Sequence, residues 1–406
     1  MPSTEYLLLV AGALLFLATL ASTALRRLGI PALLLFLALG MLAGSDGIGG
    51  IAFDDARLTQ LVGVIALAFI LFAGGLEMPW AEARATVWSG ISLSTIGVLV
   101  STAVVGGFLA VALGYGWTEG LLIGAIVSST DAAAVFSVMR TQRVPLRQRL
   151  FRILQWEAGA NDPMAIFLAI GLTQLLVNPA TTLESLALSF VRQMALGALG
   201  GLGIGLGVRW LLMRLRVGAA DLSPLLTSAT VIFTYGAVAS LGGSGFLSVF
   251  VAGLTLGAGG FTEKATVRFF HDRLATLMEI LLFLLLGLLV FPSHLPVFLG
   301  VGLLMTLVLI ALARPLSVFL SLALTRLSLR EKGFISWAGL RGAVPIVLAT
   351  IPLLAGVRHA DAIFDLVFVT VLASVLVQGT SIPLVARWLR VTEPPEIQAT
   401  PRPLPT

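Results

Sequence analysis

Long apolar runs alternate with short polar connections over almost the whole chain. Thirteen of these runs are long enough for helices that cross a membrane, because a spanning helix needs about 20 predominantly apolar residues. The run at 244–260 is the weakest, since it is short and rich in glycine. We predict helices at residues 6–25, 30–45, 58–76, 87–113, 119–139, 151–177, 186–213, 222–241, 244–260, 270–291, 295–324, 333–356 and 361–390.

The composition agrees with this pattern and excludes an ordinary soluble protein. Hydrophobic residues make up 58% of the 406 residues and charged residues only 11%, against about 25% charged residues in soluble domains. A soluble chain with this balance could not cover its core with polar surface. We therefore expect an all-α polytopic membrane protein, with a membrane domain at 1–390 and a short Pro-rich cytoplasmic tail at 391–406.

The charges predict an orientation in the membrane. Most of the 25 Lys and Arg residues fall in alternate connections, which the positive-inside rule places in the cytoplasm. The N-terminus is then expected outside and the C-terminus inside, in a bacterial cytoplasmic (inner) membrane. The basic excess is explained by this orientation and by contact with membrane lipids, so no nucleic acid partner is expected.

Two of the predicted helices are interrupted by residues that disfavour a helix interior. The fifth contains the polar run Ser128–Asp131, and the twelfth contains Arg341–Pro345, with a charge, a glycine and a proline. Each break leaves half-helices whose facing ends carry partial charges. Asp131 suits the positive N-terminal end of one, and Arg341 the negative C-terminal end of the other.

The positions of the two breaks predict an internal symmetry. They lie seven helices apart, and an odd offset means opposite orientation across the membrane. We predict two inverted six-helix repeats, at about 1–177 and 222–390, joined by a linker helix at about 186–213. Paired broken helices at matching positions of inverted repeats indicate a midplane binding site in secondary transporters. Ordinary Gly and Pro kinks are the alternative, but the charges at the breaks favour a site.

Few ionisable groups fall deep within the predicted spans, where each costs at least about 2.5–3.5 kcal/mol. The chain has no cysteine, and its three histidines lie at or near helix ends. A proton carrier at depth therefore has to be a carboxylate. The candidate groups are Asp131, Glu157, Asp162, Glu279, Arg314 and Arg341.

The sixth predicted helix carries two of these carboxylates on different faces. Glu157 and Asp162 are five residues apart, so they serve different neighbours. The small residues 158–160 should allow the backbone of another helix to approach closely. Pro163 leaves the carbonyl of Gly159 without its helical donor.

These features assign different roles to the two carboxylates. Asp162 is expected to face a water-filled cavity, where burial favours its protonated form and makes it a site for either a proton or a cation. Competition for one site is enough to produce exchange. Glu157 is expected to form a buried ion pair with Arg314, with Arg341 as the competing partner. Glu279 has no expected partner.

Four motifs together resemble the monovalent cation/proton antiporter superfamily. They are Thr130-Asp131, Asn161-Asp162-Pro163, Arg314-Pro315 and Gly339-Leu340-Arg341-Gly342. Within that superfamily the chain is similar to the NhaP branch of sodium/proton exchangers. Residues 128–137 and 161–165 are most similar to potassium/proton antiporters of the CvrA type. The resemblance covers essentially the whole chain.

The resemblance implies a thirteen-helix sodium/proton-antiporter-like fold with a six-helix core domain, a dimerisation domain and elevator-like alternating access. It implies a monovalent cation at Asp162, with Asp131, Thr130 and Asn161 shaping the site and Glu157 with Arg314 as a supporting salt bridge. The Asn-Asp pair at 161–162 implies electroneutral exchange of one proton per cation.

The resemblance also implies a homodimer and a role in pH homeostasis, without a cofactor. Relatives of the CvrA type usually continue into cytoplasmic regulatory domains, whereas this sequence ends after the Pro-rich tail, so we expect either a shorter member or part of a longer protein. The chain also departs from some relatives at Ala158, where they carry a serine that gives a side-chain oxygen to the ion. The ion shell is therefore expected to use backbone carbonyls and water.

The function expected from the sequence is that of a secondary transporter, not an enzyme. It exchanges H⁺ for a monovalent cation, with K⁺ favoured over Na⁺. The alternative is a sodium-coupled symporter of a small solute on a similar inverted-repeat fold. An ion channel is disfavoured, because no carbonyl-filter signature such as TVGYG occurs.

Overall fold

The computed structural model describes residues 4–25, 32–78, 80, 84–215 and 222–393. The described residues are almost entirely helical, and their only β-type pairing is an isolated bridge between Leu146 and Thr392. The predicted tail at 391–406 lies outside the described residues from position 394 onward. The all-α prediction is confirmed.

Thirteen helical segments follow one another in the described chain, in the order expected from the sequence. They are α1 (Thr4–Leu25), α2 (Ala32–Ala43), α3 (Ala56–Glu77), the segment α5–η2–α6 (Val87–Leu113), the pair α7 (Trp117–Ile126) and α8 (Ala132–Thr141), α9 (Gln148–Val177), α10 (Leu183–Leu215), α11 (Leu222–Ser240), α12 (Gly245–Gly257), α13 (Lys264–Leu289), the segment α14–η3–α15 (Leu295–Ser321), the pair α16 (Leu329–Trp337) and α17 (Ala343–Leu354), and α18 (Ala360–Trp388). Seven are long and apolar enough to cross a membrane by themselves.

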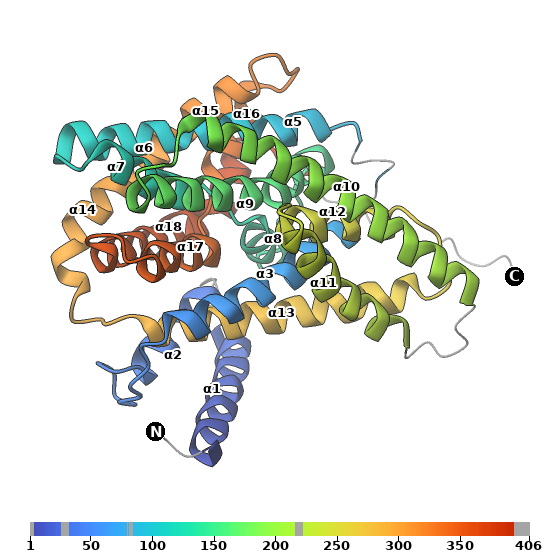
Figure 1. Cartoon of the computed structure of the whole chain (residues 1–406), viewed down its shortest axis with the longest axis horizontal. Coiled ribbons are helices and arrows are strands. Elements are labelled where there is room, and N and C mark those ends of the chain that lie inside the picture. The colour runs from blue at the N-terminus through green and yellow to red at the C-terminus, as the bar shows by residue number, and fades with distance from the viewer. Residues whose placement is uncertain (1–3, 26–31, 79, 81–83, 216–221, 394–406) are drawn as a thin grey trace, which may run out of the picture.

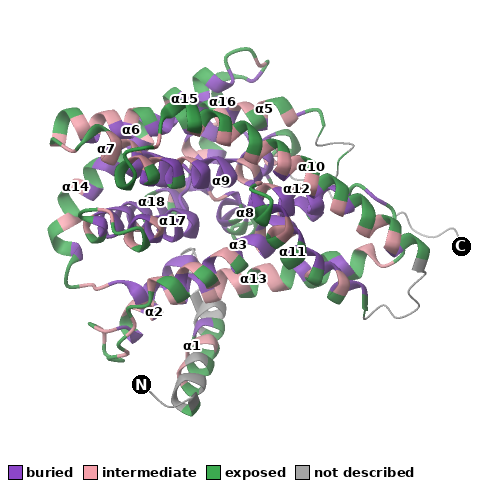
Figure 2. Ribbon diagram, in the orientation of Figure 1, coloured by how far each residue is buried: buried purple, intermediate pink, exposed green. Residues whose placement is uncertain are grey.

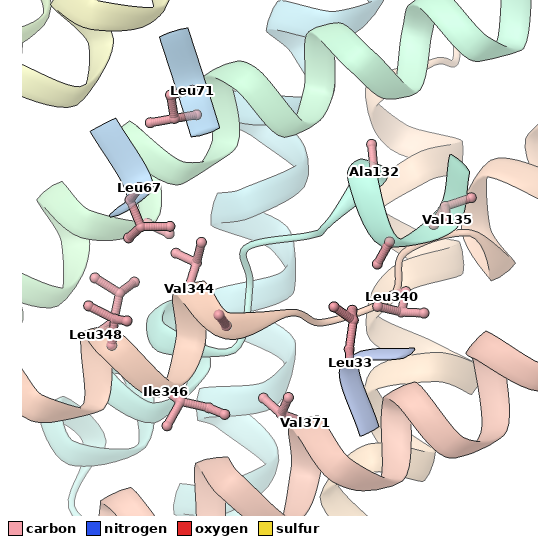
Figure 3. Close-up of a cluster of buried hydrophobic side chains, with 14 of the residues drawn as sticks. Leu33, Leu67, Leu71, Ala132, Val135, Leu340, Val344, Ile346, Leu348 and Val371 are labelled. Carbon is pink, nitrogen blue, oxygen red and sulfur yellow. The ribbon is translucent and has the colours of Figure 1, made fainter. Parts of the chain in front are cut away.

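Both predicted interruptions are present. The α-helical conformation stops between α7 and α8 and again between α16 and α17, at the polar run Ser128–Asp131 and at Gly339–Gly342. The second break begins before the predicted Arg341–Pro345, because Pro345 lies in the first turn of α17, where a helix tolerates proline. The loops are short, and buried apolar side chains surround them. Figure 3 shows Ala132 and Val135 of α8, Leu340 of the second break and Val344 of α17 in one hydrophobic cluster.

The helices pack into two groups (Figure 1). In one group α3 packs against α12 and α13, α13 against α2, and α10 against α11 and α12. In the other, α7 packs against α6 and α9, and α18 against α14 and α17. We call α1–α3 with α10–α13 the scaffold helices, and α5–α9 with α14–α18 the core helices. The division into inverted repeats stays a prediction.

Backbone-to-backbone contacts hold the scaffold helices together. A Cβ added at Gly40 of α2 would lie 2.8 Å from the Cα of Gly287 in α13, and one at Gly201 of α10 would lie 2.3 Å from the carbonyl oxygen of Ser248 in α12. Small residues allow this close approach in membrane helices. The same positions could not accept a larger side chain without separating the helices.

The outside of the molecule is apolar, as a lipid-facing surface requires. Figure 2 shows buried residues concentrated at the centre and exposed residues on the outer faces of the helices. Many exposed side chains are large and apolar, including Leu188, Phe233 and Leu303, which are between 53% and 72% exposed. In water such a surface would drive association, so it fits the hydrocarbon of a bilayer.

Candidate ion-binding site

The two helix breaks contact each other at the centre of the core helices. The backbone N–H of Asp131 donates to the carbonyl of Leu340, at 2.8 Å. Arg341 donates through Nη1 to the carbonyls of Ser128 and Ser129, at 2.5 and 2.7 Å. These carbonyls follow the end of α7, where they have no helical donor. Arg341 therefore neutralises the C-terminal end of the other broken helix.

Asp131 is held as the N-cap of α8. Its Oδ1 accepts a hydrogen bond from the N–H of Ala134 at 2.9 Å, which satisfies one of the free donors of the helix start. Gly342 provides the space for this side chain, since a Cβ at position 342 would lie 2.1 Å from Oδ2 of Asp131. Asp131 is thus part of the contact between the breaks.

Asn161 and Thr130 join α9 to the first break. The side-chain N–H of Asn161 donates to Oγ1 of Thr130 at 2.6 Å. Asn161 is fully buried, and its Oδ1 has no hydrogen-bond partner among the described residues. The amide therefore fixes the loop beside Asp162 through its N–H group, while its oxygen remains available to a further donor.

Asp162 has a hydroxyl partner that was not predicted from the sequence. The Oγ of Ser129 donates to Oδ1 of Asp162, and both residues are buried. A side-chain hydroxyl thus lies beside Asp162 although position 158 carries none. The expectation that the ion shell uses backbone carbonyls and water stays a prediction. The sequence signal for the contact between Ser129 and Asp162 was the run of four polar residues, Ser128–Asp131.

Asp162 lines a cavity of about 800 Å³ between the core and scaffold helices. The core side is formed by the first break and α9, with Ser129, Thr130, Asp131 and Asp162 among the lining residues, and the scaffold side mainly by α3 and α13. Exposed lining residues, among them Glu77, Arg140 and Asp272, mark its open end. A buried carboxylate is thus reached from the surface.

Glu157 and Arg314 form the ion pair preferred from the sequence. Nη1 of Arg314 lies 2.5 Å from Oε1 of Glu157 and Nη2 lies 2.9 Å from Oε2, and both side chains are buried. Arg314 follows the π-helical turn η3 (Leu309–Ala313), a local widening that often occurs at functional sites. A Cβ at Gly339 would lie 2.2 Å from Nε of Arg314, so this glycine admits the guanidinium.

The small residues before Asp162 have a different neighbour from the one expected. A Cβ at Gly159 would lie 2.2 Å from the ring of Phe250, a residue of α12. At Gly159 the nearest group is therefore an aromatic side chain and not the predicted helix backbone. This contact joins α9 of the core to α12 of the scaffold.

A buried carboxylate beside two crossed helix breaks, open to one side through a cavity, defines a membrane transporter of small cations. The model of the protein family described as "sodium/hydrogen exchanger, transmembrane" matches residues 12–388 of this chain. The chain belongs to this family.

Individual relatives agree with this assignment. The chain is 42% identical to the K⁺/H⁺ antiporter NhaP2 of Shewanella sp. strain ANA-3, over 96% of this chain and 68% of that protein. It is 41% identical to the K⁺/H⁺ antiporter NhaP of Alkalimonas amylolytica, over 98% and 69%.

The fold is also similar to that of the sodium proton antiporter MjNhaP1 from Methanocaldococcus jannaschii. The TM-score is 0.80 at 25% identity, and the match covers 95% of this chain and 99% of the other. The family is one of cation/proton exchangers, which are transporters and not enzymes. The comparisons do not support the symporter alternative.

Proposed function

We propose that this chain exchanges K⁺ for H⁺ across the membrane, with Asp162 as the site that both ions share. Asp162 releases its proton into the cavity, binds a cation with the help of the Ser129 hydroxyl, and the core helices then expose the site to the opposite side. The observation that carries this proposal is the position of Asp162, a buried carboxylate that lines an open cavity at the crossing of the two breaks.

The partners of the neighbouring acidic groups support a ratio of one proton per cation. Asp131 is engaged as the N-cap of α8, and Glu157 is neutralised by both terminal nitrogens of Arg314. Asn161 carries no charge. Asp162 is thus the one carboxylate of this group that is free to change between a proton and a cation, so each cycle moves equal charge in both directions.

Two observations favour K⁺ over Na⁺. The two relatives named K⁺/H⁺ antiporters share 41–42% identity with the chain, whereas the structural neighbour named a sodium proton antiporter shares 25%. Ala158 also leaves the ion shell without the side-chain oxygen that some relatives carry at this position, so the Ser129 hydroxyl is the one side-chain hydroxyl that we assign to the shell. A shell with fewer fixed ligands suits the larger ion, which loses its water more readily.

We base the proposed membrane orientation, oligomeric state and cellular role on the charge pattern of the chain and on its resemblance to cation/proton antiporters. The protein lies in a bacterial cytoplasmic membrane with its N-terminus outside and its C-terminus in the cytoplasm, because the arginine-rich connections then face inward. It works as a homodimer formed through the scaffold helices. Its role is cation-linked pH homeostasis.

The experiment that tests this proposal is cation-driven dissipation of a pH gradient in proteoliposomes, with KCl and NaCl titrated separately and the membrane voltage clamped at zero. We expect dissipation at lower K⁺ than Na⁺ concentration. The reverse order would leave exchange in place and change the assigned ion. A response to neither ion would overturn the proposed exchange. A rate that depends on an imposed membrane voltage, measured in a second series, would contradict the one-to-one ratio.

A further inference from the structure

Glu279 of α13 is a membrane carboxylate that the proposed exchange cycle does not use. It lines the cavity from the scaffold side and is partly buried. Within the described part of the chain it makes no hydrogen bond and no salt bridge. Asp131 and Arg140, at the two ends of α8, line the same cavity. Glu279 therefore faces the core helices across the cavity.

A row of side chains with polar oxygen atoms lies along the cavity face of α13 and ends at Glu279. Asp272, Thr276 and Glu279 are three or four residues apart, so they share one face of the helix, and all three line the cavity. The hydroxyl of Thr276 donates to the carbonyl of Asp272 at 2.9 Å, which leaves its lone pairs available to a cation. Beyond Glu279 the lining of α13 is apolar and buried, with Leu282 and Phe283. Glu279 is thus the deepest polar group on this wall.

The wall of the cavity that α9 forms carries one buried acceptor atom, Oε1 of Gln155, without a hydrogen-bond donor among the described residues. Gln155 lies two helical turns from Asp162 and lines the same cavity. It is 7% exposed, and its side-chain N–H donates to the carbonyl of Gly74 at 3.4 Å. Its Oε1 has no hydrogen-bond partner among the described residues. A buried acceptor without a donor is costly, and a bound cation would satisfy it.

The charges of the lining residues favour a cation in the cavity. The carboxylates of Asp131, Asp162 and Glu279 are buried or half-buried in its wall, whereas the remaining charged lining residues are exposed: Glu77, Asp272, Arg140, Arg268 and Arg273. All three arginines are exposed, so solvent screens them more than it screens the deeper carboxylates. Apolar walls strengthen the field of the buried groups.

We propose that Glu279 is a cation-binding residue of the cavity, which captures K⁺ with the Thr276 hydroxyl before the ion passes to Asp162. This inference rests on the proposed exchange activity. Glu279 belongs to a scaffold helix and Asp162 to a core helix, so movement of the core separates them. The capture site therefore serves only the side of the membrane to which the cavity opens.

The test is a sided titration of K⁺-driven exchange with Glu279→Gln. In everted membrane vesicles, where the cavity faces the bath in the proposed orientation, we expect the half-maximal K⁺ concentration to rise roughly threefold to tenfold, the effect of one charge in a partly hydrated cavity. In right-side-out vesicles we expect no change beyond twofold. Glu279→Asp should recover part of the affinity, and it replaces Glu279→Gln if that variant does not fold.

Glu77→Gln is the matched control, because it removes the same charge from an exposed position on the same cavity. We expect a shift of less than twofold. An equal shift in both variants would overturn a specific site at Glu279, as would an unchanged everted titration or an equal change on both sides. Absence of exchange in the unmodified protein would instead refute the proposed function, and the capture site with it.

Discussion

Two buried carboxylates of α9 differ in what surrounds them. Glu157 is matched by both terminal nitrogens of Arg314, so its charge is fixed. Asp162 receives one hydroxyl from Ser129 and otherwise faces the cavity. A fixed ion pair contributes to the stability of the folded core, whereas a carboxylate with a free side can exchange its ligand.

The replacement Asp162→Asn should abolish cation/proton exchange. The amide cannot release a proton and has no charge for a cation, but it has nearly the same volume and can still accept from Ser129. The folded protein should therefore survive, which size-exclusion chromatography can check. Residual cation-dependent proton movement in proteoliposomes would remove Asp162 from its assigned role.

The replacement Glu157→Gln should lower thermal stability. It leaves the guanidinium of Arg314 buried without its counter-charge, and breaking one side of a buried pair costs about 3–5 kcal/mol. The melting temperature of the purified protein measures this loss. The control is Glu184→Gln at the exposed start of α10, which should melt like the original protein. Equal melting temperatures for both variants would argue against a structural role for the pair.

The replacement Ser129→Ala should weaken cation binding. Loss of one hydrogen-bonding oxygen corresponds to about 0.5–1.5 kcal/mol, so the half-maximal cation concentration should rise between about twofold and tenfold. Ser128→Ala is the matched control, because the Ser128 hydroxyl donates to the carbonyl of Ala125 and does not line the cavity. If both variants behave alike in the exchange assay, Ser129 has no special part in the site.

At the scale of the elements, the crossing of the two breaks depends on glycine. The replacement Gly342→Ala places a methyl group where Asp131 now lies, so the breaks must move apart. Overpacking of this kind costs about 1–3 kcal/mol, and exchange activity should fall with it. Gly236→Ala on α11, where a Cβ would meet nothing within 4 Å, should be neutral or slightly stabilising. Normal exchange by Gly342→Ala would contradict this account.

The order of the elements and the positions of the breaks could be predicted from the sequence, because long apolar runs and residues that disfavour helices leave a local record. The pairing of Glu157 with Arg314 could also be predicted, because few charged residues lie deep within the predicted spans. The contact of Ser129 with Asp162 could not, because it depends on how a non-helical loop turns its side chains. Phe250 beside Gly159 joins two helices far apart in the sequence, and no local pattern encodes it.

At the scale of the whole molecule, the contacts between scaffold and core are few compared with those inside each group. They include Phe250 against Gly159 and Val347 of α17 against Gly63 of α3. The ion site belongs to the core, and the far wall of the cavity belongs to the scaffold. Movement of the core against the scaffold would therefore change which side of the membrane reaches Asp162.

A disulfide across this boundary should stop exchange. A Cβ at Gly63 would lie 3.6 Å from the Cβ of Val347, within the range of disulfides, and the chain has no cysteine of its own. The pair Gly63→Cys and Val347→Cys should be active when reduced and inactive when oxidised. The control pair, Gly200→Cys and Val238→Cys, has a spacing of 3.7 Å but lies within the scaffold, so oxidation should leave it active. Full exchange by the oxidised first pair would rule out this movement.

The contact between Gly342 and Asp131 should also constrain how the sequence evolves. Two positions more than two hundred residues apart share one small volume, so neither can grow unless the other shrinks. Among related proteins, a larger residue at the position of Gly342 should occur together with a shorter one at the position of Asp131. The same coupling should link Gly339 with Arg314, and the two motifs would then evolve as one unit.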